Sequence, residues 1–275
     1  MRIARYSYQG RRGVGIVTGD EIMPAGDQLL DPAVEGEPIS LSAVELLSPI
    51  GPGAKIICVG LNYTDHAEES GDTAPEEPLI FAKLPNSLIG SSDPIILPDL
   101  SDKVDYEAEL GVVIGLRARN VARDEARKVV FGYTCVNDVS ARDLQLGDRQ
   151  WTRGKSLDTF CPVGPWVVTA DEIGDPHGLG IRTWVGGELL QDGNTKEMIF
   201  DVWHQIETLS TVCTLEPGDV IATGTPAGVG VARTPPRFLR AGDVVRIEIE
   251  GIGALENPVL AEPDDTATSL DEPAS

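Results

Sequence analysis

The segment that decides the fold is residues 105–114, which read Asp105-Tyr106-Glu107-Ala108-Glu109-Leu110-Gly111-Val112-Val113-Ile114. We expect a strand over residues 106–114, because the segment ends in an apolar, β-branched run that enters a core. Successive side chains of a strand point to opposite faces, so Glu107 and Glu109 share one face. Two half-buried carboxylates repel each other unless a cation or a proton lies between them. The segment therefore indicates either a cation site in a β-rich fold or two acids at a solvated strand edge.

A third acid favours the cation site. Asp138 follows the apolar stretch 129–136 and opens the polar stretch 137–145, where a buried strand is expected to end. Three carboxylates with room for water ligands suit Mg²⁺ or Mn²⁺, whereas zinc would prefer His or Cys. The alternative for Asp138 is a helix cap, a common role of Asp between a strand and a helix.

A candidate general base lies earlier in the chain. His66 and Glu69 are three residues apart in an expected helix over residues 64–70, so the carboxylate can hold the imidazole as a base near neutral pH. His204 and Glu207 repeat this spacing, but they lie away from the apolar stripe of a helix expected over residues 196–210. We interpret that second pair as surface residues, so spacing alone is weak support for a base.

The glycine-rich stretch 224–230 looks like a phosphate loop, but no Gly-Lys-Ser/Thr follows it. We expect a turn between strands, unless its amides and the Thr225 hydroxyl meet a ligand carboxylate. The sequence contains no serine-hydrolase elbow, no zinc-protease helix motif and no dinucleotide fingerprint after a strand. These three enzyme classes are therefore excluded.

Composition limits the partners. The chain has 275 residues, with 44 acids against 22 bases and a net charge of −22, which argues against nucleic acid and anionic membrane as partners. Its 30 glycines and 20 prolines indicate many turns and a strand-rich fold. There is no apolar signal region and no apolar run of about 18 residues. The four scattered cysteines suggest buried free thiols, so we expect a cytoplasmic protein.

Three parts are expected along the chain: a small N-terminal domain over residues 1–50, a catalytic domain over residues 51–260 and a disordered acidic tail over residues 261–275. The N-terminal part should contain strands at 2–8 and 13–18, a short helix around 41–47 and a linker at 48–53. Further helices are expected over 64–70, 122–128 and 196–210. Further strands are expected over 55–59, 79–82, 130–136, 165–168, 181–185, 220–223 and 244–249.

Five ordered motifs over about residues 55–260 resemble the fumarylacetoacetate hydrolase superfamily, in particular its bacterial acylpyruvate hydrolase and 2-hydroxyhepta-2,4-diene-1,7-dioate isomerase members. The motifs are Val59-Gly60-Leu61-Asn62-Tyr63 with His66 and Glu69, Asp105-Tyr106-Glu107 with Glu109-Leu110, and the stretches 137–145, 154–160 and 217–226. The resemblance implies an α+β, mostly β fold, namely a mixed β-sandwich roll with a small N-terminal β domain, usually in a homodimer. It also implies a divalent cation, Mg²⁺ or Mn²⁺ (or Ca²⁺ in a crystal), held by Glu107, Glu109 and Asp138.

The resemblance further implies a role for each remaining motif residue. His66 and Glu69 would form a lid over the site, Lys155 would touch the substrate or a metal-bound water, and Arg142 and Gln145 would orient the far carbonyl or its oxyanion. These five residues are the expected catalytic set. Substrate contacts are implied for Asn62, Tyr63, Gly224 and Thr225, with a substrate carboxylate at Thr225.

The expected reaction cleaves a C–C bond in a 2,4-dioxo acid of the acylpyruvate or fumarylpyruvate type, yielding pyruvate and a carboxylic acid in aromatic-compound catabolism. In this hypothesis the cation binds the carboxylate and 2-oxo group and stabilises an enolate, while His66 activates water. The same enolate would serve an isomerase acting on 5-carboxymethyl-2-hydroxymuconate or 2-hydroxyhepta-2,4-diene-1,7-dioate, or a decarboxylase, for example of oxaloacetate. The motifs do not separate these reactions, whose substrates are all small anionic 2-oxo acids. A non-catalytic cation-binding interaction protein is a further alternative.

Overall fold

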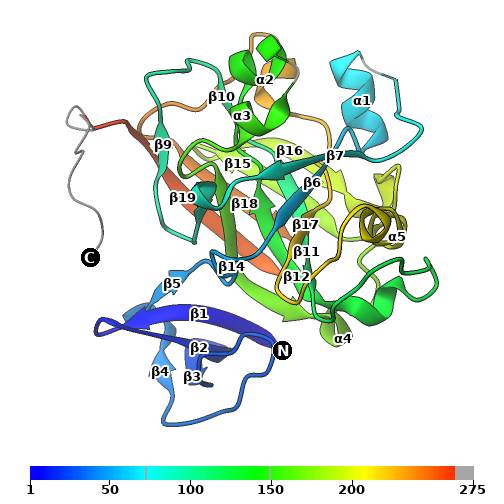
Figure 1. The fold of residues 1–275 in the computed structure, drawn as a ribbon. Coiled ribbons are helices and arrows are strands. Elements are labelled where there is room, and N and C mark those ends of the chain that lie inside the picture. The colour runs from blue at the N-terminus through cyan, green and yellow to red at the C-terminus, as the bar shows by residue number, and fades with distance from the viewer. Residues whose placement is uncertain (72, 149, 264–275) are drawn as a thin grey trace, which may run out of the picture.

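The structure, a computed structural model, describes residues 1–71, 73–148 and 150–263. Two β-sheets form the body, and a small lobe of N-terminal strands lies at one end of it (Figure 1). This mostly β architecture with a small N-terminal domain confirms the expected fold class. Of the acidic tail expected over residues 261–275, residues 264–275 lie outside the described residues, and Ala261 still belongs to a strand.

Within the described residues, the larger sheet has twelve strands and runs from the N-terminal lobe through the body. Its path in space is β4 (Ile39–Ser40), β3 (Glu21–Pro24), β2 (Arg11–Thr18), β1 (Arg2–Tyr8), β14 (Cys161–Thr169), β12 (Val130–Asn137), β11 (Ala108–Ile114), β17 (Val220–Ala222), β6 (Ile56–Gly60) and β7 (Leu79–Lys83). Off this path, β5 (Glu45–Leu47) pairs with β1, and β8 (Leu88–Ile89) pairs with β14. The lobe joins the body where Arg2 and Ile3 pair with Val168 and Val167.

The second sheet packs on one face of the first. Its order is β16 (Glu188–Asn194), β15 (Gly180–Val185), β18 (Val244–Ile249), β19 (Gly253–Ala261) and β9 (Ile95–Leu97). A short pair joins β10 (Val104–Asp105) to β13 (Ser140–Ala141). The α-helices among the described residues are α1 (Thr64–Ser70), α2 (Arg142–Asp148), α3 (Trp151–Lys155), α4 (Ala170–Ile173) and α5 (Val202–Val212). Of these, α1, α2 and α3 lie at the end of the body opposite the N-terminal lobe (Figure 1).

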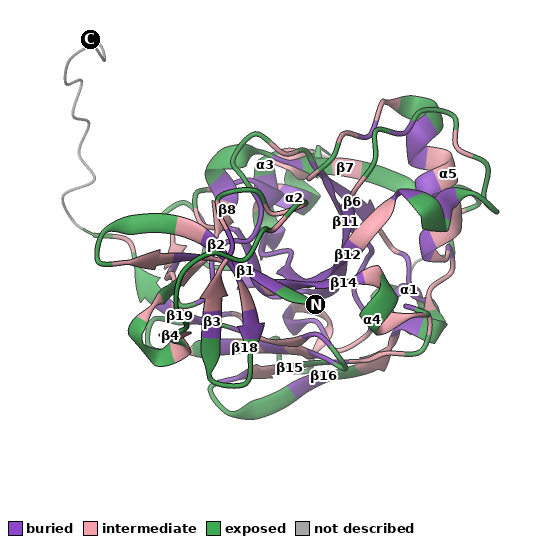
Figure 2. Cartoon of the chain, turned by 90° about the horizontal axis from the view of Figure 1, so that it is seen from below, coloured by how far each residue is buried: buried purple, intermediate pink, exposed green. Residues whose placement is uncertain are grey.

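Strand β11 lies at the centre and is buried along its whole length (Figure 2). Its Leu110 and Val112 belong to the core cluster that also contains Ile247 of the second sheet. Val113 belongs to a separate cluster with Val136. Because side chains alternate along a strand, Glu109 points to the same face as Val113.

Three sequence-based expectations for helices need correction. Residues 41–47 form only a 3₁₀ turn, η1 (Leu41–Ala43), before strand β5, because Glu45–Leu47 pair with β1. Residues 122–128 contain turns and the 3₁₀ helix η3 (Ala126–Val129), with backbone bonds three residues apart rather than four. The helix expected from residue 196 begins at Val202, because the Asp201 side chain caps it by accepting from His204 N at 2.8 Å.

Candidate active site

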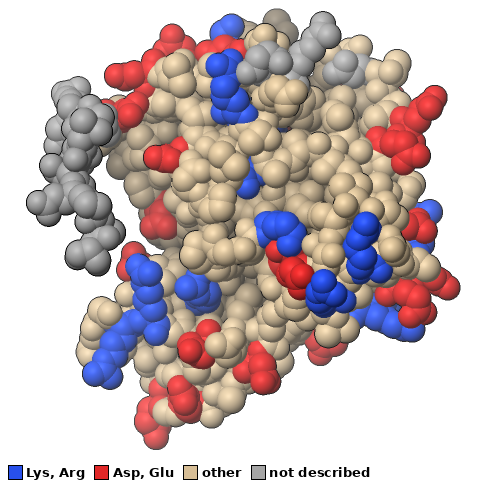
Figure 3. Space-filling view, viewed as in Figure 1, with Lys and Arg blue, Asp and Glu red and all other residues tan. Residues whose placement is uncertain are grey.

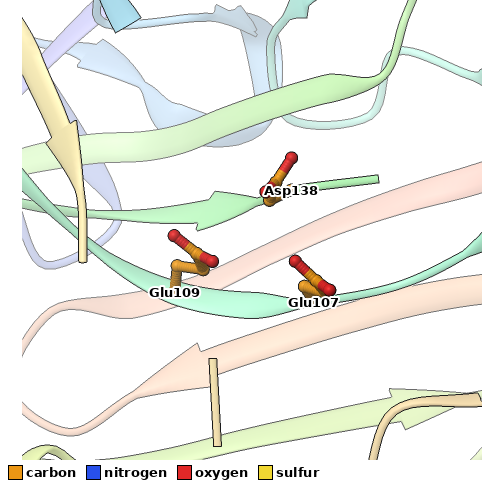
Figure 4. Close-up of side chains that lie close together, drawn as sticks. All are labelled: Glu107, Glu109 and Asp138. Atoms are coloured by element: carbon orange, nitrogen blue, oxygen red, sulfur yellow. The ribbon is translucent and has the colours of Figure 1, made fainter. Parts of the chain in front are cut away.

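Three carboxylates meet at the N-terminal end of β11. Glu109 lies in β11, Glu107 directly precedes it and Asp138 directly follows β12, as Figure 4 shows. Asp138 N donates to Glu107 O at 3.0 Å, which ties the two strand ends together. One oxygen from each of the three carboxylates lies within 4.8 Å of the others, and all three residues are buried. The structure thus brings together the predicted cation ligands. The strand expected over residues 106–114 begins only at Ala108, so Glu107 lies just before it.

Three cationic side chains surround the carboxylates. Lys155 Nζ lies 2.6 Å from Glu107 Oε2 and 2.7 Å from Asp138 Oδ2. Lys83 Nζ lies 2.5 Å from Asp138 Oδ1, and Arg142 Nη1 lies 2.7 Å from Glu107 Oε1. Asp138 therefore faces lysine ammonium groups rather than a helix end, which argues against the helix-cap alternative.

Glu109 has no cationic partner among the described residues. It accepts a hydrogen bond from Gly224 N at 3.0 Å. Burial and the carboxylates of Asp138 and Glu107 raise the pKa of Glu109 well above its usual value. A buried carboxylate that lacks a counter-charge beside two further hard oxygen donors fits a divalent cation of the Mg²⁺ type. The residues present therefore fit the implied metal.

Glu107 and Lys155, which lie beside Glu109, stay ionised. Burial opposes ionisation of Glu107, but Lys155 and Arg142 outweigh it and lower the pKa of Glu107. Burial likewise opposes protonation of Lys155, but Asp138 and Glu107 raise its pKa to about 12. Lys155 is therefore a permanent cation in the site and is not available as a base at neutral pH.

His66 and Glu69 form the predicted pair on α1. His66 Nδ1 lies 2.8 Å from Glu69 Oε1, and the second oxygen of Glu69 accepts from Gly228 N at 2.9 Å. Both residues line the cavity that Glu107 and Glu109 also line. By contrast, the half-buried His204 ring packs edge-on against Phe200, with ring centroids 5.2 Å apart, and does not line that cavity. The expectation that His204 and Glu207 are surface residues needs correction, because both are half-buried, but their place away from the cavity agrees with the separation of the two histidine pairs.

The cavity has a volume of about 300 Å³, at the lower end of the range for small-molecule sites. Its polar wall consists of His66, Glu69, Ser70, Glu107, Glu109, Arg142, Gln145, Lys155 and Thr225. Its apolar wall includes Val59, Gly60, Leu61, Phe81, Leu146, Trp151, Val231 and Ala232. Such a site is suited to a small polar or anionic metabolite.

Three of the four implied substrate contacts are not on this wall. The Asn62 side chain is used internally, since it donates to Thr223 O at 2.6 Å and accepts from Phe200 N at 2.8 Å. Tyr63 is fully buried, and the Gly224 amide is held by Glu109. Thr225 does line the cavity, where its Oγ1 lies 2.8 Å from Gln191 Nε2.

Sequence reasoning missed Lys83, which is buried and also donates to Val139 O at 3.1 Å. The available signal was a lysine placed two residues after Phe81 in an otherwise apolar strand, so that both side chains share one face. The Phe81 ring in turn lies 5.1 Å from Lys155 Nζ and packs edge-on against Trp151. Strand β7 therefore supplies both a cation and an aromatic wall to the site.

On the face of the molecule in Figure 3, acidic and basic side chains are interspersed and separated by uncharged surface. The acidic excess forms no single patch on that face. In the described part of the chain, every helix is too short or too polar to cross a membrane.

Comparisons with known proteins match both parts of the chain to family models. Residues 55–260 match the family model described as fumarylacetoacetate (FAA) hydrolase C-terminal, and residues 1–49 match one described as Rv2993c-like, N-terminal. The Xenopus laevis protein named oxaloacetate tautomerase fahd2, mitochondrial, is 52% identical over 224 residues, which cover 81% of this chain and 70% of the relative.

Two solved structures are similar over nearly the whole chain. One is 5-carboxymethyl-2-hydroxymuconate delta-isomerase from Mycobacterium smegmatis, with a TM-score of 0.86 and 40% identity over 95% of this chain and 100% of that one. The other is a fumarylacetoacetate hydrolase from psychrophilic Exiguobacterium antarcticum, with a TM-score of 0.87 and 41% identity over the same shares, 95% and 100%. These relatives include a tautomerase, an isomerase and a hydrolase.

Proposed function

The chain belongs to the fumarylacetoacetate hydrolase family, and we propose that it is an enzyme that moves a proton between carbon and oxygen in a small 2-oxo dicarboxylate such as oxaloacetate. The observation that carries this proposal is the His66–Glu69 pair, which lines the same cavity as Glu107 and Glu109. The tautomerase and isomerase relatives favour this alternative over the C–C hydrolysis expected from the sequence.

A divalent cation held by Glu107, Glu109 and Asp138 would supply Lewis acidity for the negative charge that develops on the 2-oxo oxygen. The chain's own residues perform the remaining steps. They bind the substrate's carboxylate, orient the carbon that loses its proton, and hold that proton.

His66 is the proposed proton carrier. Glu69 accepts from His66 Nδ1, which leaves Nε2 to take a proton from the carbon next to the 2-oxo group. The C–H bond breaks, its electron pair forms the C=C bond of the enol, the C=O π pair moves onto the oxygen, and that oxygen takes the proton that His66 removed from carbon. Return of the proton to carbon reverses the reaction, so no water is consumed and no C–C bond breaks.

Arg142 is the proposed anchor for a substrate carboxylate. Its Nε donates to Asp105, its Nη1 to Glu107 and Gln145, and its buried Nη2 has no hydrogen-bond partner among the described residues. Because Arg142 lines the cavity, its guanidinium suits a carboxylate of the substrate. Lys155 adds a fixed positive charge beside it.

The test is to follow oxaloacetate with purified protein in Mg²⁺ or Mn²⁺. Loss of the enol absorbance and exchange of the C3 hydrogens for deuterium, read by NMR, should both accelerate. Pyruvate formation is measured in parallel to separate decarboxylation from tautomerisation. Acetylpyruvate and 5-carboxymethyl-2-hydroxymuconate are run as rival substrates, and fast pyruvate release from acetylpyruvate without C3 exchange in oxaloacetate would restore the hydrolase interpretation.

A further inference from the structure

The glycine-rich stretch 224–231 holds carboxylates of the protein itself. Besides the Gly224 amide on Glu109 and the Gly228 amide on Glu69, Gly230 N donates to Asp105 Oδ1 at 2.8 Å and Val231 N donates to Asp105 Oδ2 at 3.0 Å. Four backbone amides of one short segment thus bind three different carboxylates. Each of these carboxylates belongs to, or touches, a residue on the cavity wall.

Asp105 is the member of this group that is furthest from solvent. It is fully buried, and its Oδ1 also accepts from Tyr106 N at 2.9 Å. Its Oδ2 accepts from Arg142 Nε at 2.8 Å. Both oxygens are therefore shared between the glycine-rich stretch and other groups, and Arg142 is the single cationic partner that the described residues provide for Asp105.

Only glycine lets the stretch come this close. A Cβ at Gly228, where φ is +104°, would lie 2.2 Å from Leu190 O. A Cβ at Gly230 would lie 2.1 Å from Arg237 O and 2.5 Å from Asp105 Oδ1. Neither contact is possible for a side-chain carbon, so the two glycines are required for the amides to reach Glu69 and Asp105.

We propose that Asp105 is a positioning residue that fixes Arg142 to the glycine-rich stretch, and that the stretch in turn couples Arg142 to the Glu69–His66 pair. Asp105 occupies Nε of the guanidinium, Nη1 pairs with Glu107, and the buried Nη2 has no hydrogen-bond partner among the described residues. The segment that carries the Asp105 contacts also presents the Gly228 amide to Glu69, two residues before Gly230. Displacement of the Asp105–Arg142 pair should therefore move the Glu69–His66 pair, and the reverse should also hold.

The test variant is Asp105→Asn, which keeps the size of the side chain. Asparagine has one acceptor oxygen where four donors converge, and it carries no charge to match Arg142. The activity part of the test rests on the proposed function: KM for oxaloacetate should rise and kcat should fall, with kcat/KM lower by about 10- to 100-fold. Amide hydrogen exchange in the peptide that spans residues 224–237, measured by hydrogen–deuterium exchange mass spectrometry, should become faster by on the order of tenfold.

Asp219→Asn is the matched control. Asp219 is also buried, accepts from two backbone amides, Lys55 N at 2.8 Å and Glu216 N at 2.7 Å, and pairs with one cation, Lys55, at 2.6 Å. It does not line the cavity. Asp219→Asn should lower thermal stability to a similar extent while leaving KM, kcat and exchange at residues 224–237 unchanged.

Val231→Pro is the milder second variant, for use if Asp105→Asn does not fold. It removes one donor to Asp105 and leaves the carboxylate, and proline is tolerated in the first turn of a helical segment. It should shift KM and exchange in the same direction by a smaller factor. If either folded variant keeps wild-type KM, kcat and exchange rates, the proposal is overturned.

The exchange measurement separates this proposal from the proposed function, because it needs no substrate. Glu69→Gln should also speed exchange at residues 224–237, since the Gly228 amide loses a charged acceptor. Accelerated exchange in an enzyme that does not act on oxaloacetate would support the coupling and contradict the proposed function. Oxaloacetate turnover with unchanged exchange in all variants would do the reverse.

Discussion

Lys83 Nζ lies 2.5 Å from Asp138 Oδ1, and neither side chain is exposed to solvent. The pair joins strand β7 at the edge of the large sheet to the residue that follows β12 near its centre. Because a buried carboxylate without a counter-charge is costly, Lys83 and Lys155 together offset the cost of burying the Asp138 carboxylate.

Replacement of Lys83 by methionine should therefore destabilise the protein strongly. We expect Lys83→Met to lower the free energy of unfolding by about 3–5 kcal/mol in urea titrations, because Asp138 keeps a buried charge with one partner fewer. The double variant Lys83→Met, Asp138→Asn should recover part of the loss. Lys55→Met is the control: its side chain is 42% exposed, so loss of its pair with Asp219 should cost about 1 kcal/mol or less. Equal losses in the two lysine variants would contradict the assignment.

The metal-free protein should lose stability as the pH rises. Burial and the carboxylates of Asp138 and Glu107 raise the pKa of Glu109 in the folded state. Protonated Glu109 therefore stabilises the fold fully at a pH below its unfolded pKa of about 4.3, and this stabilisation is lost as the pH rises through its folded pKa. In thermal melts with EDTA from about pH 5 to pH 8, the melting temperature of the wild type should fall relative to that of Glu109→Gln.

Two additions sharpen this experiment. Added Mg²⁺ or Mn²⁺ should stabilise wild type and have little effect on Glu109→Gln, because the variant lacks one ligand charge. Glu107→Gln should behave in the opposite way without metal, since the pKa of Glu107 is lowered and its charge pairs with Lys155 and Arg142. If Glu109→Gln is less stable than the metal-free wild type at every pH, the idea that the buried Glu109 carboxylate destabilises the metal-free protein is wrong.

The two histidine pairs provide an internal comparison. His66→Gln should lower kcat for C3 proton exchange by about 10²- to 10⁴-fold, because the general base is removed. His204→Gln repeats the substitution at the pair on α5 and should leave kcat unchanged, because His204 does not line the cavity. Similar kcat values for the two variants would exclude His66 as the base.

The cysteines should react unequally with a thiol reagent. Cys58, Cys135 and Cys161 are buried, and burial raises the pKa of Cys135 and of Cys161 to about 12, whereas Cys213 is only partly buried. The thiolate is the reactive form of cysteine. With an aromatic disulfide reagent at moderately alkaline pH, at most one thiol of the native protein should therefore react, whereas all four cysteines of the unfolded protein should react. Rapid modification of the native Cys213→Ser variant would show that a further thiol is accessible.

The sequence by itself determined the local parts of the site. The spacing of two residues put the Glu107 and Glu109 carboxylates near each other, although Glu107 lies just before strand β11, and the helical spacing of three put Glu69 beside His66. The order of the motifs identified the family, and the turn-rich composition agreed with the mostly β fold. The homodimer and the cytoplasmic location stay predictions.

Only the tertiary structure decided which distant groups complete the site. Lys83 is 55 residues from Asp138 in the chain, and Gly230 is 125 residues from Asp105, yet each pair is in contact. The glycine-rich stretch is expected from the sequence to be a turn between strands, and only the structure shows that its amides bind the protein's own carboxylates. The reason is physical: periodicity reports neighbours within one strand or helix, whereas contacts between elements depend on sheet order and on backbone approaches that glycine permits.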